Sequence, residues 1–173
     1  MLWVRSRTRL AGSRARREHR EGRAVNVMAM EPLDLETQPP RSPHVQLGGL
    51  YMLARTIDKL RATLPGGNLG SYRIAGFSAQ LLEKLGTPED ALRDVVARET
   101  SDDDVASWVQ RHSNPANYDG INAEQANQIV GDRLNRPDFV ERYPFVTTLP
   151  PQTTLFEMLD IDDGGMFAGQ RGD

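Results

Sequence analysis

Short stripes of leucine and valine, broken at intervals by glycine and proline, constrain this chain more than any other feature. The first stripe has the three- and four-residue spacing of one apolar helix face, and it consists of Leu50, Leu53, Ile57, Leu60 and Leu64. The sequence Pro65-Gly66-Gly67 follows directly and ends a helix sharply. The spacing therefore predicts a helix over residues 49–64.

Comparable stripes and start signals predict further short helices. Ser78 is expected to cap a helix that ends at Gly86, with Leu81, Leu82 and Leu85 inward. Two more helices are expected to begin at Thr87-Pro88-Glu89-Asp90 and at Ser101. Their inward residues would be Leu92, Val95 and Val96 in the first, and Val105, Trp108 and Val109 in the second.

The second half of the chain carries weaker signals. Residues 112–120 are interpreted as a loop, and the capping-box pattern of Asn122 and Gln125 predicts a helix over 123–134. Pro137 and Thr154 predict the starts of two more helices. The expected fold is all-α, a compact bundle of six or seven short helices, with a loop or a brief hairpin at 68–76.

Charge divides the chain into unequal parts. The first 27 residues contain eight Arg and two Glu, whereas the remainder contains 13 basic and 22 acidic residues. We expect a disordered Arg-rich leader at 1–30, a proline-rich lead-in at 31–48, one helical domain at 49–163 and a flexible tail at 164–173. Three interpretations of the leader stay open: a start site assigned upstream of Met28 or Met30, a functional basic arm, or a transit peptide.

Composition excludes several classes of protein. The chain has no cysteine, which rules out disulfides, thiolate zinc sites and cysteine nucleophiles. No apolar run approaches the roughly 20 residues that span a bilayer, so we expect a cytoplasmic protein without membrane contact. An acidic body repels phosphate, which makes nucleic-acid binding by the folded part an unfavourable hypothesis.

Sequence patterns that suggest chemistry have simpler structural interpretations. The glycines at 66, 67 and 70 follow a helix end, where a phosphate loop would precede a helix. Asp102, Asp103 and Asp104 suit the first turn of a helix, and the acidic run at 160–163 lacks the glycine and glutamate positions of a calcium loop. We therefore expect no catalytic residues, no metal site and no cofactor.

Five residues form the candidate binding site. Tyr72 and Arg73 lie in the glycine-rich segment, where functional side chains often occur. Trp108, Arg111 and His112 lie at the end of a predicted helix, and Trp108 is interpreted either as a core residue or as a surface anchor. The hypothesis places a site between that segment and the end of that helix.

The order of several short motifs within residues 40–112 resembles a bacterial family known as domain of unknown function 5069. The motifs are Pro40-Arg41-Ser42-Pro43, Leu47-Gly48-Gly49, Ile57-Asp58-Lys59, Leu69-Gly70-Ser71-Tyr72, Leu81-Leu82 through Leu85-Gly86, Ser101-Asp102-Asp103 and Trp108-Val109. The resemblance implies no activity, substrate or catalytic residue.

Three functional classes follow from these observations. The favoured one is a non-catalytic interaction or regulatory module with a protein partner, because capped helices and an acidic surface accompany no catalytic constellation. The first alternative is a small-ligand-binding protein or enzyme with a site near Tyr72 and Trp108. The second alternative is contact with nucleic acid through the basic leader.

Overall fold

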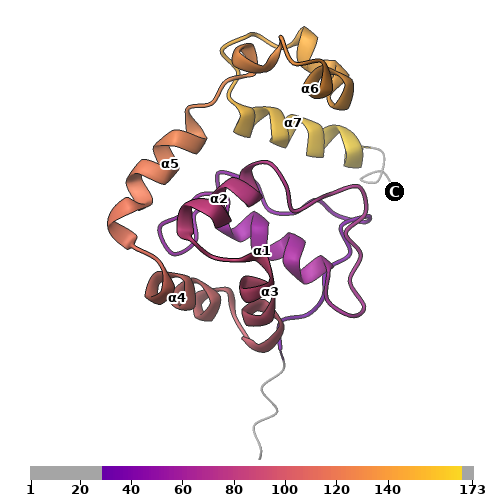
Figure 1. Cartoon of the computed structure of the whole chain (residues 1–173). Helices are drawn as coiled ribbons and strands as arrows, with labels where there is room; N and C mark the ends of the chain where they lie inside the picture. The colour runs from indigo at the N-terminus through magenta and orange to yellow at the C-terminus, as the bar shows by residue number, and fades with distance from the viewer. Residues whose placement is uncertain (1–28, 169–173) are drawn as a thin grey trace, which may run out of the picture.

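The computed structural model describes residues 29–168, which form an all-α fold as the sequence predicts (Figure 1). Its elements in chain order are α1 (Leu53–Ala62), α2 (Phe77–Leu85), α3 (Glu89–Arg98), α4 (Asp102–His112), the 3-10 turn η1 (Pro115–Asn117), α5 (Tyr118–Ala126), η2 (Val130–Arg133), α6 (Pro137–Arg142), η3 (Pro144–Thr148) and α7 (Leu155–Phe167). The expected leader lies outside the described residues, apart from its last positions. Of these, Met30 is buried and its N–H donates to the Glu99 carbonyl, so the ordered part begins earlier than predicted.

The central helix α1 carries the predicted apolar stripe. Leu50, Leu53, Ile57 and Leu60 are completely buried. The helix begins at Leu53 rather than near residue 49, because Gly48, Gly49 and Met52 have φ angles of 58°, 86° and 63°. Such angles are incompatible with a right-handed helix, so residues 47–52 form a turn that leads into α1.

Helix α1 is also buried on the side that carries its polar and charged residues. Arg55, Thr56, Asp58 and Lys59 are all buried. The proline-rich lead-in covers part of this side, since Arg41 donates three hydrogen bonds to the Asp58 carboxylate at 2.7–2.9 Å. A fully buried helix needs a partner for every polar group that it carries.

Helices α2, α3 and α4 confirm most of the predicted stripes. Ser101 caps α4, its hydroxyl accepting from the Asp104 N–H at 3.1 Å. Two predicted caps are wrong: Thr87 is buried one residue before Pro88 and caps nothing, and Ser78 lies inside α2. The Ser78 hydroxyl is the partner of Thr56, which donates to it at 3.1 Å across the contact with α1.

The helix predicted over 123–134 is wrong in both bounds, because α5 begins at Tyr118 within the expected loop and ends at Ala126. A tertiary contact explains the difference. Instead of capping, the Asn122 side chain accepts from the Tyr51 N–H at 2.9 Å and donates to the Gly49 carbonyl at 2.8 Å. Asn122 therefore ties the middle of α5 to the turn before α1, and the capping-box pattern was misleading.

The segment 68–76 forms a loop and no hairpin. Its first residue pairs instead with the lead-in, the Asn68 N–H donating to the Leu33 carbonyl at 2.9 Å and the Leu35 N–H donating to the Asn68 carbonyl at 2.7 Å. Asn68 thus forms its backbone pairing with the lead-in, and residues 68–76 do not pair with one another as strands.

Helix α7 begins at the predicted capping box of Thr154 and Glu157 but extends further than expected. The flexible tail predicted from residue 164 is wrong up to Phe167. Phe156, Asp163 and Phe167 are buried and lie seven and four residues apart, on one face of the helix. Because Asp163 and Phe167 continue the buried face that begins at Phe156, α7 extends into the predicted tail.

Two apolar clusters build the interior. The main cluster surrounds α1 and draws residues from α2 to α5, whereas a smaller one gathers Val130, Val146, Leu155 and Met158 beneath α6 and η3. In Figure 1, α6 and α7 lie above the main cluster, and α5 runs along one side between the two parts. Phe156 of α7 enters the main cluster, where its ring meets those of His44, Tyr51 and Phe77 edge-on.

Replacing Phe156 tests this anchor. We expect Phe156→Ala to lower the free energy of unfolding by about 3–5 kcal/mol, as for other buried aromatic truncations, and urea unfolding would measure the loss. Ile161→Ala on the same helix is the control, because Ile161 is 47% exposed and should change stability by less than about 0.5 kcal/mol. Equal losses in the two variants would contradict the assignment of Phe156 as the anchor of α7.

Candidate functional site

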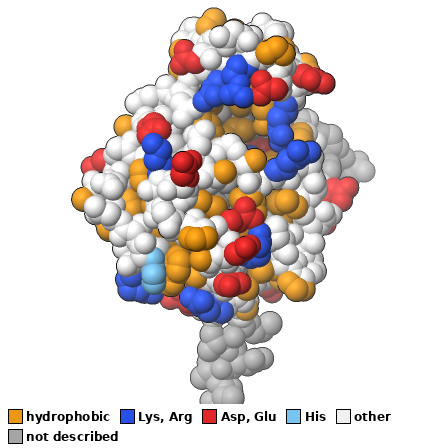
Figure 2. All heavy atoms as spheres, in the orientation of Figure 1, with side chains coloured by type: hydrophobic (Ala, Val, Ile, Leu, Met, Phe, Trp, Pro, Cys, Tyr) orange, Lys and Arg blue, Asp and Glu red, His pale blue; other side chains and the backbone are white. Residues whose placement is uncertain are grey.

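A cavity of about 650 Å³ lies between the two apolar clusters. Its walls come from α1, the 68–76 loop, the start of α2, the segment from η2 to α6, and α7. Figure 2 shows this hollow face, with Lys and Arg side chains on its rim and hydrophobic side chains further in.

The cavity is strongly cationic although most of the chain is acidic. Six basic side chains line it, namely Arg55, Lys59, Arg73, Arg133, Arg136 and Arg142, against two acidic ones, Asp138 and Asp162. Arg136 pairs with Asp138 at 2.7 Å. Within residues 29–168, no carboxylate forms an ion pair with Lys59, Arg73, Arg133 or Arg142. The cavity therefore holds positive charge that no described carboxylate neutralises by contact.

Arg55 and Asp163 form a buried ion pair at the inner wall. Two Arg55 nitrogens donate to the Asp163 carboxylate at 2.7 and 3.1 Å, and the two side chains are 2% and 8% exposed. The Tyr72 hydroxyl donates to the same carboxylate at 2.7 Å. Burial and this hydrogen bond hold the pKa of Tyr72 well above its usual value, so the phenol stays protonated. The three residues thus connect α1, the 68–76 loop and α7.

Lys59 lies one helical turn after Arg55 and lines the same cavity. Its Nζ donates to the Arg73 carbonyl at 3.1 Å. Burial lowers the pKa of Lys59 to about 7, and the positive charges of Arg55 and Arg142 outweigh the opposite effect of Asp163. Near neutral pH this amine therefore exists in both its charged and its neutral form.

Two arginines from the second half of the chain complete the charged wall. Arg133 of η2 donates to the Gln128 side-chain oxygen at 2.7 Å, and Arg142 of α6 lies over the Tyr143 ring, to whose hydroxyl it donates at 3.0 Å. Both are held by neutral groups, so both keep donors for a ligand. Asp162 of α7 is an acidic residue of the lining. Burial, and then the charge of Asp163, raise its pKa.

The rest of the lining is apolar and aromatic. Phe77, Phe139, Tyr143, Met158 and Leu159 contribute to it. Such walls with a few convergent charged groups are typical of small-molecule sites, which have volumes of about 300–1,000 Å³. The cavity is thus suited in size and chemistry to a small ligand with an anionic group and an apolar part.

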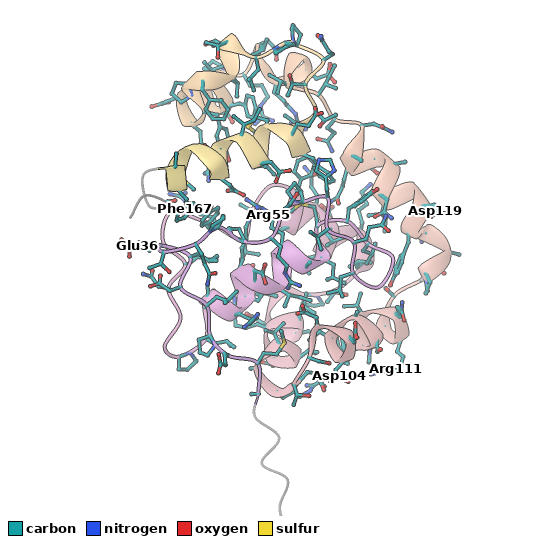
Figure 3. All side chains as sticks on the ribbon, turned by 180° about the vertical axis from the view of Figure 1, so that it is seen from behind. Glu36, Arg55, Asp104, Arg111, Asp119 and Phe167 are labelled. Atoms are coloured by element: carbon teal, nitrogen blue, oxygen red, sulfur yellow. The ribbon has the colours of Figure 1, made fainter. Side chains whose placement is uncertain are left out.

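The structure separates the five residues that the sequence proposed as one site. Tyr72 and Arg73 line the cavity, whereas Trp108, Arg111 and His112 are not among its lining residues. Trp108 is partly buried against the main cluster and stacks on His112 with ring centroids 4.1 Å apart. Figure 3 shows the separation, with Arg55 beneath α7 and Arg111 on the distant α4.

Sequence reasoning missed most of the cavity. No role in a site was assigned from the sequence to Arg55, Lys59 or Asp163, nor to the segments that form η2 and α6. One signal was present: Arg55 and Lys59 are spaced four residues apart on a helix whose other residues are mostly apolar. The arginines at 133, 136 and 142 are distant in sequence from Lys59, and only the tertiary fold brings them to the same cavity.

Two further features are absent from residues 29–168. No group of three or more His, Asp or Glu side chains is placed there to hold a metal ion. In the same range, no helix has the length and apolar character needed to cross a membrane.

A family model described as "Domain of unknown function (DUF5069)" matches residues 37–165, which is most of the described chain and extends well beyond residues 40–112. No curated protein matches the chain. The matched range includes both halves of the cavity, from Lys59 on α1 to Asp162 on α7.

Neutralising one partner of the buried ion pair tests its role in the site. We expect Asp163→Asn to lower the free energy of unfolding by about 3–5 kcal/mol, because Arg55 would be left charged and buried without a counter-ion. The neighbouring Asp162→Asn should not destabilise the protein, since the pKa of Asp162 is raised and its charged form is already disfavoured. Thermal and urea unfolding would compare the two, and equal effects would contradict this view of Asp163.

Proposed function

This chain belongs to the family described as Domain of unknown function (DUF5069), and since that description assigns no activity, we propose from the cavity that the protein binds a small organic anion. The ligand would place its carboxylate or phosphate among the arginines and its apolar part against the aromatic wall. Small-ligand binding is the first alternative that the sequence suggested.

One observation supports the proposal above all others. Beyond residue 27 the chain has 22 acidic and 13 basic residues, yet six of those basic residues line one cavity with only two acids. Like charges that converge on a partly dry space cost free energy unless an opposite charge joins them. An anionic ligand supplies that charge.

The arginine geometry favours carboxylate or phosphate over other anions. A guanidinium presents a planar fork of donors that matches two oxygens of such a group. Arg133 and Arg142 approach the cavity from η2 and α6, while Lys59 approaches from α1. Oxygen atoms of one anionic group could therefore be bound from two sides.

The other expectations from the sequence stay predictions. A protein partner remains one, and α4 offers the stacked Trp108 and His112 as a contact surface for it. The cytoplasmic location and the nucleic-acid role of the leader are likewise untested, and the leader lies outside the described residues. We propose ligand binding ahead of them because the cavity combines size, charge and an apolar wall.

Titration with phenyl phosphate, followed by ligand-observed NMR, tests the proposal. We expect the double variant Arg133→Gln/Arg142→Gln to bind at least tenfold more weakly, because each lost charged hydrogen bond contributes about 1.5–3 kcal/mol. Arg98→Gln/Arg111→Gln is the matched control, since it removes the same two charges from α3 and α4 outside the cavity. Benzyl alcohol, which lacks the anionic group, should bind more weakly than phenyl phosphate.

Two results would contradict the proposal. One is no detectable binding of phenyl phosphate by the wild type. The other is an equal loss in the cavity variant and in Arg98→Gln/Arg111→Gln, which would show that general charge and not the cavity attracts the anion.

A further inference from the structure

The lysine content of the chain draws attention to one cavity residue. Of 21 basic residues, only Lys59 and Lys84 are lysine. Lys84 is 45% exposed and pairs with Glu124 at 2.9 Å, whereas Lys59 is buried in the cavity wall. If the cavity needed only positive charge at this position, arginine would supply it with more donors. Lysine differs in that its amine can become neutral and nucleophilic.

The surroundings of Lys59 suit a neutral amine. Its charged neighbours are Arg55 and Arg142, which disfavour a second positive charge, and Asp163, which favours one. Asp163 is already engaged, because it accepts hydrogen bonds from Arg55 and from Tyr72. The contact made by the amine itself is with a neutral group, the Arg73 carbonyl. Buried lysines beside other cations are a recognised means of activating an amine as a nucleophile.

The same neighbours determine which electrophile could reach the amine. A carbonyl compound that also carries a carboxylate or phosphate could bind Arg142 or Arg73 through its anionic group, because both arginines line the same cavity as Lys59. The aromatic walls from Phe77 and Tyr143 would contact its apolar part. The geometry thus combines an anion subsite and an amine within a single cavity.

We infer that Lys59 forms an imine with a small aldehyde or ketone that bears an anionic group. In this step the Nζ lone pair adds to the carbonyl carbon, and a C=N bond replaces the C=O bond. The carbonyl oxygen leaves as water with the two amine protons, so no oxidant or reductant takes part. The inference rests on the proposed anion binding and adds a covalent step to it.

Reductive trapping of the full-length protein with para-formylbenzoate and borohydride tests the inference, because borohydride converts an imine to a stable amine. Peptide mapping by mass spectrometry then compares Lys59 with Lys84 in the same sample, and it separates both from the α-amino group. We expect adduct formation at Lys59 to exceed that at Lys84 by at least tenfold, although Lys84 is the more exposed. No variant has to fold for this comparison.

Four controls sharpen the test. The methyl ester of para-formylbenzoate has the same aldehyde without the charge, so it should label Lys59 more slowly. Phenyl phosphate should protect Lys59 and leave Lys84 unaffected. The labelling rate of Lys59 should rise as the pH passes through about 7, where its pKa lies, because only the neutral amine adds to a carbonyl. Lys59→Gln should remove the adduct while Lys84 labelling persists.

The outcomes separate the two proposals. Equal labelling of Lys59 and Lys84, or equal rates with the acid and its ester, would overturn the imine inference. If phenyl phosphate still binds in a manner that depends on Arg133 and Arg142, anion binding would stand without it. If phenyl phosphate does not bind, the proposed function fails as well.

Discussion

Burial of α1 on nearly every side is the constraint on which the rest of the structure depends, since all of its residues except Arg61 are buried. The surroundings of this helix of roughly three turns cannot be apolar on every side, because the helix carries Arg55, Thr56, Asp58 and Lys59 among its apolar residues. Each of these side chains finds its partner in a different segment: α7, α2, the lead-in and the 68–76 loop. Buried polar groups without partners cost more free energy than most single contacts provide. The surrounding segments therefore bind most of the polar groups of α1 as well as covering its apolar face. Among these four side chains, only the Arg55 Nε lacks a hydrogen-bond partner within residues 29–168.

The charge of the cavity follows from how those partners are distributed. Asp58 is satisfied by Arg41 and Arg55 by Asp163, whereas Lys59 meets only a backbone carbonyl. Helix α6 and η2 then add Arg142 and Arg133 from above, held by Tyr143 and Gln128. Positively charged side chains therefore line the cavity on both sides. This excess of positive charge connects the packing of α1 to the proposed binding of an anion.

Local patterns predicted what local interactions determine. The stripes of α1 and α3, the cap at Ser101 and the capping box at Thr154 depend on residues within two turns of one another, and the structure confirms them. The bounds of α5 and the end of α7 depend on Asn122 and Asp163, whose partners are 71 and 108 residues away. Local patterns alone predicted a helix cap at Asn122 and a flexible tail from residue 164. The cavity was missed for the same reason, although Tyr72 and Arg73 were identified from their place in a loop.

The ionisation of Lys59 tests the central claim most directly, because it reports the burial of α1 and the unneutralised charge of the cavity together. With only two lysines in the chain, carbon NMR of the side-chain methylene next to Nζ can follow both through a pH titration. The account predicts that Lys59 titrates near pH 7 and that the pKa of Lys84 lies above its ordinary value beside Glu124. Titration of Lys59 with an ordinary pKa of about 10.4 would contradict it.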